Sequence, residues 1–276
     1  MFDVHVHTAP CVVPRLADDV RTVDWYEAAG FDGCVLKSHC ESTVGRAATA
    51  GVGRRMAVYG GLVLNATVGG LNPIAVAAGL SMGARVVWLP TVDARRHRES
   101  ALTHPPSCAS ALGEGPSFAA PPVDTSTAAT LRTIFGLVAE ADAVLATGHI
   151  GAAEAAWVTA EATRAGVSRL LLTHPSFTVP AMSAAETRSL CDQGAVAEIT
   201  AYQLLHQDGC DAGALAAFIR AVGYERCLLS SDAGQPDSPP APDALLHLVE
   251  VLAAQGLDRG ALHAMASDIP KALVMP

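Results

Sequence analysis

Residues 2–7, Phe-Asp-Val-His-Val-His, alternate between apolar and polar side chains at the start of the chain. Successive side chains of a β-strand point to opposite faces, so this period of two predicts a strand. We expect Asp3, His5 and His7 on one face of it, with Val4 and Val6 on the other. Two imidazoles on one face of a strand can bind one cation, although histidines are also common as structural residues.

Seven more short aliphatic runs follow, and most of the eight begin 25 to 31 residues apart. We expect these further strands at 32–39, 57–64, 84–91, 143–149, 169–174, 195–200 and 226–232. The spacing suits a strand, a loop and a crossover helix, and helix signals lie between the runs, as where 152–165 ends at Gly166. No Gly-rich nucleotide loop follows the first strand. The alternation therefore predicts a single-domain α/β fold, a (β/α)8 TIM barrel over residues 1–276, in preference to a doubly wound sheet.

One interval between strands is longer than the others. The fourth and fifth expected strands begin at 84 and 143, 59 residues apart, and the excess around 92–126 is rich in proline. An insertion after the C-terminal end of a barrel strand lies on the face that carries active sites, so we predict a lid or a partner-binding loop there. An insertion without such a role is the alternative.

The composition argues against several classes of protein. The 276 residues are 50% hydrophobic and include 27 acidic against 18 basic residues with no Lys/Arg cluster, so a broad nucleic-acid surface is not expected. No apolar stretch approaches the roughly 20 residues that cross a membrane. The first residues, MFDVHVHT, lack the basic segment and apolar core of a secretion signal, so we expect a cytoplasmic protein whose seven cysteines are reduced.

Side chains that bind metals recur at the ends of the expected strands. His149 ends the fifth strand, His174 the sixth and Asp232 the eighth. Because the C-terminal ends of barrel strands converge on one mouth, these three should meet His5 and His7 there. Imidazole nitrogens and a carboxylate oxygen suit Zn²⁺, with Mn²⁺, Fe²⁺ or Co²⁺ as alternatives. We therefore expect one or two divalent ions per chain.

This set of residues resembles that of the metal-dependent amidohydrolase superfamily, in the same order and over essentially the whole chain. The segment 267–273, Ser-Asp-Ile-Pro-Lys-Ala-Leu, is similar to the Asn-Pro-Ala helix start of that superfamily, with Asp268 in place of Asn. The segments LATGH (145–149), LLTHPSF (171–177) and SSDAGQP (230–236) further resemble an uncharacterised branch of it.

The resemblance implies roles for the strand-end residues. His5, His7 and Asp232 would hold the more buried metal, and His149 and His174 would hold a second metal or complete the first site. Asp232 would also act in catalysis, taking a proton from the metal-activated water and passing it to the leaving group.

One departure from the superfamily concerns the fourth strand. Binuclear members bridge their metals with a Lys carbamate or a Glu at its end, but residues 88–91, Trp-Leu-Pro-Thr, offer neither. Lys37 and His39, on one face at the end of the second strand, and Glu198, inward on the seventh, could substitute. Lys37 could be a carbamate ligand, a cation that holds a substrate carboxylate, or a salt-bridge partner at the rim. We predict catalytic roles for His174 and Lys37, and substrate contacts for Lys37, His39 and Glu198, with one metal slightly favoured over two.

Loop residues are weaker candidates for contacts with a substrate. Arg15 could clamp a carboxylate or a phosphate, and Gln235 follows the eighth strand closely. His97 stands among three arginines after the fourth strand, where it could add positive charge to the mouth or belong to a solvated surface. We predict that the remaining histidines are structural or surface residues, namely His104, His206, His247 and His263.

The residues together predict a metal-dependent hydrolase that attacks a small, anionic amide, lactam, lactone or ester with metal-activated water. A metal-dependent decarboxylase or hydratase of the same superfamily is the first alternative. A phosphoesterase of the polymerase-and-histidinol-phosphatase type is the second, although it needs more ligands than this chain offers, and a barrel kept for binding alone is the third. We expect a small-molecule substrate as partner, no nucleic acid and no membrane, and leave a homo-oligomer open.

Overall fold

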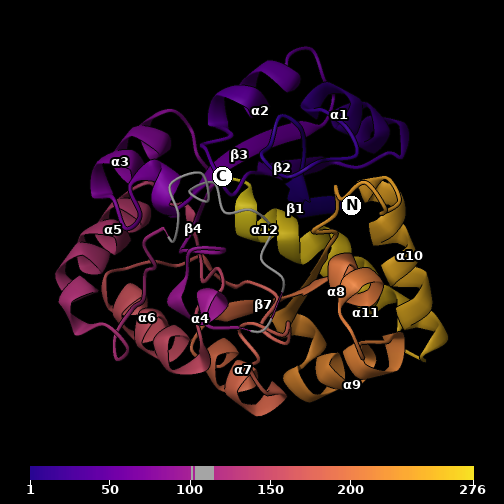
Figure 1. Ribbon diagram of the computed structural model, residues 1–276. Coiled ribbons are helices and arrows are strands. Elements are labelled where there is room, and N and C mark those ends of the chain that lie inside the picture. The colour runs from indigo at the N-terminus through magenta and orange to yellow at the C-terminus, as the bar shows by residue number, and fades with distance from the viewer. Residues whose placement is uncertain (101, 103–114) are drawn as a thin grey trace.

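The computed structural model describes residues 1–100, 102 and 115–276 of the chain. Eight parallel strands form one sheet in sequence order, and helices surround them (Figure 1). The strands are β1 (Phe2–His7), β2 (Gly33–Lys37), β3 (Ala57–Val63), β4 (Val86–Trp88), β5 (Val144–Ala146), β6 (Leu170–Leu172), β7 (Ala195–Thr200) and β8 (Cys227–Ser230). The α-helices are α1 (Asp19–Ala28), α2 (Val44–Ala50), α3 (Pro73–Ser81), α4 (Arg95–Arg98), α5 (Ala128–Glu140), α6 (Ala152–Arg164), α7 (Ala184–Cys191), α8 (Ala201–His206), α9 (Ala212–Val222), α10 (Ala241–Ala254), α11 (Arg259–His263) and α12 (Ile269–Val274).

The first and last strands close the barrel. Val6 pairs in parallel with Ala233, just beyond β8, and the Asp232 amide donates to the His5 carbonyl at 2.8 Å. All eight expected strands are present, so the predicted single-domain (β/α)8 barrel is confirmed. Strands β4, β5 and β6 have only three residues each, so His149 and His174 follow the strand ends rather than belong to the strands.

The connecting helices begin and end at the residues that the sequence indicates. The Asp18 side chain accepts a hydrogen bond from the Arg21 amide at 2.8 Å and so caps the start of α1. Gly166 and Gly223, which follow α6 and α9, have φ angles of 90° and 112°. Glycine adopts such positive φ angles readily, so it allows the chain to turn back into the next strand.

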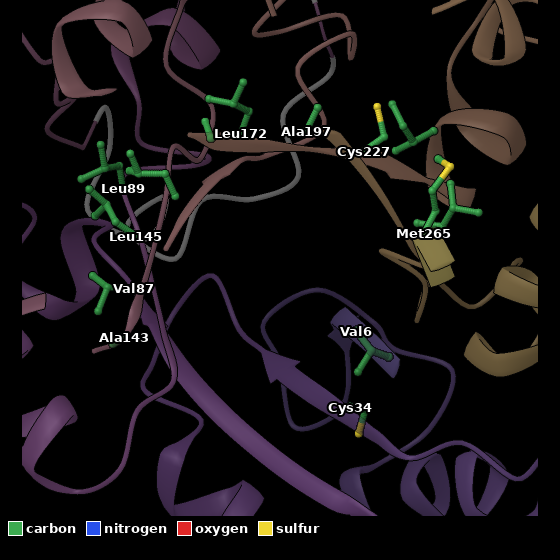
Figure 2. Packing of buried hydrophobic residues seen from close by; sticks show 14 of the residues in the cluster. Val6, Cys34, Val87, Leu89, Ala143, Leu145, Leu172, Ala197, Cys227 and Met265 are labelled. Atoms are coloured by element: carbon green, nitrogen blue, oxygen red, sulfur yellow. The ribbon is translucent and has the colours of Figure 1, made fainter. Parts of the chain in front are cut away.

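Apolar side chains form two layers, one outside the barrel and one inside it. The outer cluster packs the strands against the helices and includes Val87, Leu145 and Leu172 (Figure 2). The inner cluster fills the barrel and includes Val35, Val86 and Trp88. The outer layer is the larger of the two, and it attaches each crossover helix to the strands that it connects.

Helix α12 closes the end of the barrel where the strands begin. Its Leu273 and Val274 belong to the inner cluster, and the guanidinium of Arg169, next to the start of β6, donates to the Leu273 carbonyl at 2.8 Å. Ser267 and Asp268 belong to a π-helical stretch, Ala264–Asp268, that connects α11 to α12 without a break, so the expected helix start in the segment 267–273 was wrong. The segment also lies at the opposite end of the barrel from the expected site. The other end, where the strands finish, stays open for a site.

The first strand contains an irregularity that changes which side chains face inward. Its register with β2 shifts between Asp3 and Val6, as a β-bulge would produce. Val4 packs in the inner cluster, whereas the Asp3 carboxylate accepts from the Tyr26 hydroxyl of α1 at 2.5 Å. The predicted faces of Asp3 and Val4 were therefore wrong, and His5 and His7 point into the barrel without Asp3.

Part of the predicted insertion at 92–126 falls on residues 101 and 103–114, which lie outside the described residues, as does His104, so the lid stays a prediction. Of the described cysteines, Cys11, Cys34, Cys191, Cys210 and Cys227 are free thiols, as expected. Cys40 is disulfide-bonded, so the expectation of reduced cysteines was wrong there. Within the described ranges, every helix is too short or too polar to traverse a lipid bilayer.

Candidate metal centre and active site

A cavity of about 570 Å³ opens at the end of the barrel where the strands finish. Its lining includes eight of the ten predicted site residues, namely His7, Arg15, Lys37, His39, His149, His174, Asp232 and Gln235. The other two, His5 and Glu198, are completely buried next to these residues. The barrel therefore brings all the predicted site residues to one end, as convergent strand ends require.

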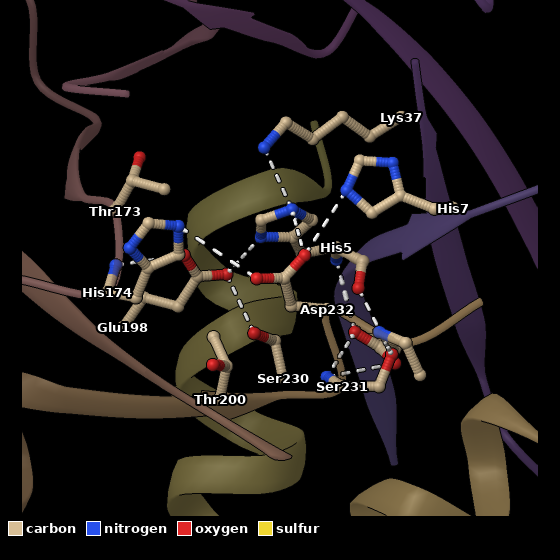
Figure 3. A network of polar contacts seen from close by, with 12 residues as sticks. His5, His7, Lys37, Thr173, His174, Glu198, Thr200, Ser230, Ser231 and Asp232 are labelled. Atoms are coloured by element: carbon tan, nitrogen blue, oxygen red, sulfur yellow. Dashed lines mark hydrogen bonds and ion pairs between the residues drawn. The ribbon is translucent and has the colours of Figure 1, made fainter. Parts of the chain in front are cut away.

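Three donor groups meet at the bottom of this cavity. Oδ1 of Asp232 lies 2.9 Å from Nε2 of His5 and 3.2 Å from Nε2 of His7 (Figure 3). Their potential ligand atoms all lie within 4.8 Å of one another. Ligands of a tetrahedral zinc ion at about 2.0–2.1 Å from it stand roughly 3.3 Å apart, so these separations fit one such ion.

Glu198 holds the second nitrogen of His5. Nδ1 of His5 donates to Oε1 of Glu198 at 3.0 Å, and the Ser230 hydroxyl donates to the same oxygen at 2.7 Å. Burial alone would lower the pKa of His5, but the carboxylates of Asp232 and Glu198 raise it above its ordinary value. A carboxylate behind a metal-binding histidine fixes the ring and its tautomer. Glu198 therefore orients His5, and its predicted contact with substrate finds no support in this position.

The two carboxylate oxygens of Asp232 have different surroundings. Oδ1 faces His5 and His7, whereas Oδ2 lies 3.9 Å from Nε2 of His174. Burial alone would raise the pKa of the Asp232 carboxyl, but His5 and His7 hold it well below its ordinary value. The group is therefore an anion at neutral pH, with one oxygen directed to the donor cluster and the other available to a neighbouring reactant.

Lys37 reaches the same cluster from the end of β2. Its Nζ lies 2.8 Å from Nε2 of His5 (Figure 3). The same atom lies 5.3 Å from the centre of the Trp88 ring. The side chain is 1% exposed, and burial lowers its pKa to about 8. Lys37 is therefore not a salt-bridge partner at the rim, and the choice between carbamate and free cation stays open.

His174 follows β6 with a φ of 26°, which turns its ring toward Asp232. Burial lowers its pKa to about 4, so the ring is neutral at physiological pH. Its Nδ1 is buried and has no hydrogen-bond partner in the described part of the chain. A neutral imidazole with an unoccupied nitrogen can bind a cation or exchange a proton with a substrate.

His149 lies on the wall of the cavity, outside the group of His5, His7 and Asp232. Its ring centre is 5.0 Å from that of His174 and 6.3 Å from that of His39. Nδ1 of His39 is 2.9 Å from the Thr91 hydroxyl, which also accepts from the Asn65 amide at 2.8 Å. The predicted roles of His149 as a ligand and of His39 as a substrate contact remain predictions.

Arg15 and Gln235 lie around the cavity, as predicted. Nε of Arg15 is buried, and no acceptor among the described residues bonds to it. The side chain of Gln235 is used locally, since Nε2 donates to the Asp232 carbonyl at 3.1 Å and Oε1 accepts from Ser238 at 3.2 Å. Arg15 is thus the freer of the two to contact a ligand.

Two further histidines line the cavity although the sequence did not point to them firmly. His97 is 4% exposed and its Nδ1 lies 2.6 Å from Nδ1 of His149, so it is not part of a solvated surface. His206 lies against the Tyr202 ring, at 4.9 Å between centres, and its Nε2 is 2.7 Å from the Ser238 hydroxyl. The prediction of a structural or surface role was incomplete for His206; its position in α8, directly after β7, was the available signal.

The donor set fits a divalent cation of the zinc class. It contains two imidazole nitrogens and one carboxylate oxygen at mutual distances that suit one ion. Without a cation, Nε2 of His5 has two neighbours with opposite requirements. A hydrogen bond to Oδ1 of Asp232 requires a proton on Nε2, whereas a hydrogen bond from Nζ of Lys37 requires a lone pair on Nε2. His5, His7 and Asp232 are therefore the residues that would hold the ion.

Solved structures of known proteins share the fold. A lactonase template engineered toward organophosphate hydrolysis aligns with a TM-score of 0.63 at 13% identity, covering 99% of this chain and 95% of that one. An organophosphorus hydrolase from Deinococcus radiodurans gives 0.62 at 13% identity, covering 99% and 92%. A 2,6-dihydroxybenzoate decarboxylase gives 0.60 at 13% identity, covering 100% and 98%. These neighbours are members of the amidohydrolase superfamily, so the predicted resemblance is confirmed at the level of the fold.

The sequence itself is matched by one family model. None of the curated protein sequences compared with the chain matches it. The model described as a family of unknown function, DUF6282, matches residues 1–198, a range that contains His5, His7, Lys37, His149 and His174. This range is well over half of the 276 residues. The chain therefore belongs to the DUF6282 family and has the barrel fold of the amidohydrolase superfamily.

Proposed function

We propose that the chain is a metal-dependent hydrolase of a small, anionic amide, lactam, lactone or ester. The observation that carries the proposal is the group of His5, His7 and Asp232, which lies at the bottom of a cavity of about 570 Å³. Such a volume suits a small-molecule substrate. Zn²⁺ is the ion that this donor set favours.

The metal and the chain would divide the chemistry between them. When bound, a divalent cation supplies a Lewis acid that polarises the scissile carbonyl and lowers the pKa of a water molecule toward about 7. His5 and His7 hold the cation with neutral nitrogens, and Glu198 keeps the proton of His5 on Nδ1. His5 Nε2 thereby presents its lone pair to the cavity.

Asp232 is the group placed to move the proton. Its Oδ2 lies away from His5 and His7, on the side of His174 at 3.9 Å. It would accept the proton of the attacking water and return it to the leaving nitrogen or oxygen. His174, neutral because burial lowers its pKa to about 4, would contribute a hydrogen bond to the substrate or complete the metal site.

The proposed negative charge of the substrate follows from Arg15 and Lys37. Nε of Arg15 is buried without an acceptor in the described residues, so a carboxylate that entered the cavity would satisfy it. The rest of the wall mixes apolar side chains, including Val13, Val92 and Phe177, with polar ones such as Gln207 and Asp208. The cavity therefore suits a compact substrate that places an anionic group at Arg15 and has both apolar and polar parts.

Substrate screening of the metal-loaded protein tests the proposal. We expect hydrolysis of at least one carboxylated lactone, lactam or ester, with no turnover after a chelator removes the metal and recovery when Zn²⁺ or Mn²⁺ is returned. His5→Ala should abolish turnover, because it removes a central donor. Turnover that survives both the chelator and His5→Ala would refute the proposal.

A decarboxylase is the second candidate. The end of β4 has Thr91, bonded to Asn65 and close to His39, in place of a bridging Lys or Glu, and the donor set fits one ion. A 2,6-dihydroxybenzoate decarboxylase is also among the structures that share the fold. Release of CO2 from aromatic or unsaturated carboxylic acids, without hydrolysis of any cyclic amide or lactone, would favour this candidate.

A further inference from the structure

His97 and His149 form a direct ring-to-ring contact on the wall of the cavity. Their Nδ1 atoms lie 2.6 Å apart, and the rings are nearly parallel, at 13°, with centres 4.8 Å apart. Both rings are buried, at 4% and 6% exposed. Two nitrogens at this distance require one proton between them, so one ring donates from Nδ1 and the other accepts.

The short helix that carries His97 is fixed to the rest of the protein. Arg96, next to His97, donates from Nε to the Val179 carbonyl at 2.9 Å, and Arg98 donates to the Asp93 carboxylate at 2.7 Å. The hydroxyl of Ser100 donates to the His97 carbonyl at 2.7 Å. The arginines around His97 therefore anchor α4, and the His97 ring has a defined position against His149.

The backbone of His149 is fixed as well. Its amide donates to the Pro90 carbonyl at 2.9 Å, beyond the end of β4. Gly148 precedes it with a φ of 62°, and any side chain at this position would collide with the carbonyl oxygens of Leu89 and Pro90. The ring of His149 thus leaves the end of β5 in one direction, with Nδ1 toward His97.

We propose that His97 is a positioning residue that accepts the Nδ1 proton of His149 and so leaves Nε2 of His149 as a lone pair directed to the cavity. A neutral imidazole carries one proton, and the hydrogen bond at one nitrogen determines which nitrogen is free. In the opposite arrangement, His97 would donate, and His149 would present an N–H that cannot bind a cation. His97 thus gives the wall of the cavity a ligand-competent histidine on the side where β4 supplies no Lys or Glu.

The inference rests on the proposed function for the direction of this hydrogen bond, because a cation needs the bare Nε2 of His149, but its first test needs no metal. The metal-free protein is labelled with ¹⁵N-histidine, and long-range ¹H–¹⁵N spectra are recorded at neutral pH, with His149 assigned through the loss of its signals in His149→Gln. We expect Nδ1 of His149 to be protonated and Nε2 to be bare. A proton on Nε2 of His149 in the wild-type protein would overturn the inference.

Variants provide the second test. His97→Phe keeps an aromatic ring but removes the hydrogen-bond acceptor, and His97→Asn provides an acceptor on a shorter side chain. His247→Phe, at an exposed position of α10, is the control. We expect His97→Phe to shift His149 toward the Nε2-protonated tautomer and to weaken Zn²⁺ binding roughly tenfold or more, with partial recovery in His97→Asn. A tautomer and an affinity equal to those of the control would overturn the inference.

The outcomes separate this inference from the proposed function. If the protein binds no metal but His149 carries its proton on Nδ1, the proposed function fails and the positioning role stands. If the protein binds metal and hydrolyses its substrate while His149 carries its proton on Nε2, the proposed function stands and the positioning role fails. The wild-type spectrum decides the point even if a variant does not fold.

Discussion

Glu198 accepts the Nδ1 proton of His5 at 3.0 Å, on the side of the ring opposite the Nε2 atom that meets Asp232 at 2.9 Å (Figure 3). The two residues come from strands on different parts of the chain, β7 and β1, and both are completely buried. A buried carboxylate that fixes the tautomer of a histidine is the arrangement found behind metal ligands. The contact is therefore the clearest sign that His5 is held ready for a cation.

Loss of this contact should weaken metal binding. Glu198→Gln keeps the size of the side chain but removes the charge that fixes the Nδ1 proton of His5, so we expect the affinity for Zn²⁺ to fall about 10- to 100-fold. Competition titration against a chelator measures the change. Glu250→Gln, at an exposed position of α10, is the matched control, and an equal affinity in the two variants would contradict the assigned role.

Acid sensitivity should depend on His174. Its pKa is about 4 in the folded protein against 6.5 for an ordinary histidine, so the unfolded chain takes up this proton first as the pH falls. The stability contributed by the neutral ring is complete above pH 6.5 and is lost as the pH falls toward 4, by about 3 kcal/mol.

Denaturant unfolding of the metal-free protein at several pH values measures this effect. The free energy of unfolding of His174→Gln should decline less between pH 7 and pH 4 than that of the wild-type protein, because glutamine does not titrate. His247→Gln controls for an exposed histidine. Parallel pH curves for the wild-type protein and His174→Gln would contradict the buried, neutral state of His174.

Arg15 should act on substrate binding more than on turnover. Its guanidinium has a buried Nε without an acceptor in the described residues, so a substrate carboxylate would gain a charge-assisted hydrogen bond there. For Arg15→Met we expect KM to rise about 10- to 100-fold for a carboxylated substrate, with kcat changed only a few-fold. Steady-state kinetics measure these changes, and Arg21→Met, at an exposed position of α1, is the control. An unchanged KM in Arg15→Met would contradict the assignment of Arg15 to the substrate-binding site.

Tyr26 should stabilise the irregular first strand. Its hydroxyl donates to the buried Asp3 carboxylate at 2.5 Å, and that carboxylate also accepts from the Ser231 amide at 3.1 Å. Tyr26→Phe leaves the carboxylate short of one donor, so we expect a loss of about 1–3 kcal/mol in the free energy of unfolding. Urea unfolding compares it with Tyr224→Phe, at a partly exposed position, and equal losses would contradict this account of the bulge.

The fold could be predicted from the sequence because the short aliphatic runs repeat at the length of one strand and one crossover helix. Each repeat contributes a strand end to the same mouth, so the order of the runs alone assigns His149, His174 and Asp232 to one site. The predicted strands β4, β5 and β6 were too long. The periodicity of apolar residues indicates that a strand exists. The residue at which the strand ends depends on how far it forms hydrogen bonds with the adjacent strands, and the periodicity does not give that.

The features that the sequence did not reveal depend on contacts between distant residues. The bulge in β1 moves Asp3 out of the barrel, because Tyr26 and Ser231 offer its carboxylate donors outside the strand. In the sequence His97 is one member of an arginine-rich run, but those arginines bind partners such as Val179 and leave the histidine to face the cavity. The alternation of polar and apolar residues along one segment does not specify such contacts with distant residues.

Metal analysis of the purified protein tests the central claim most directly. After incubation with Zn²⁺ or Mn²⁺ and removal of the excess, we expect the wild-type protein to retain about one ion per chain or more, and a His5→Ala/His7→Ala double variant to lose the ion bound at this site. A wild-type content below about 0.2 ions per chain, or an equal content in the double variant, would contradict a metal centre formed by His5, His7 and Asp232.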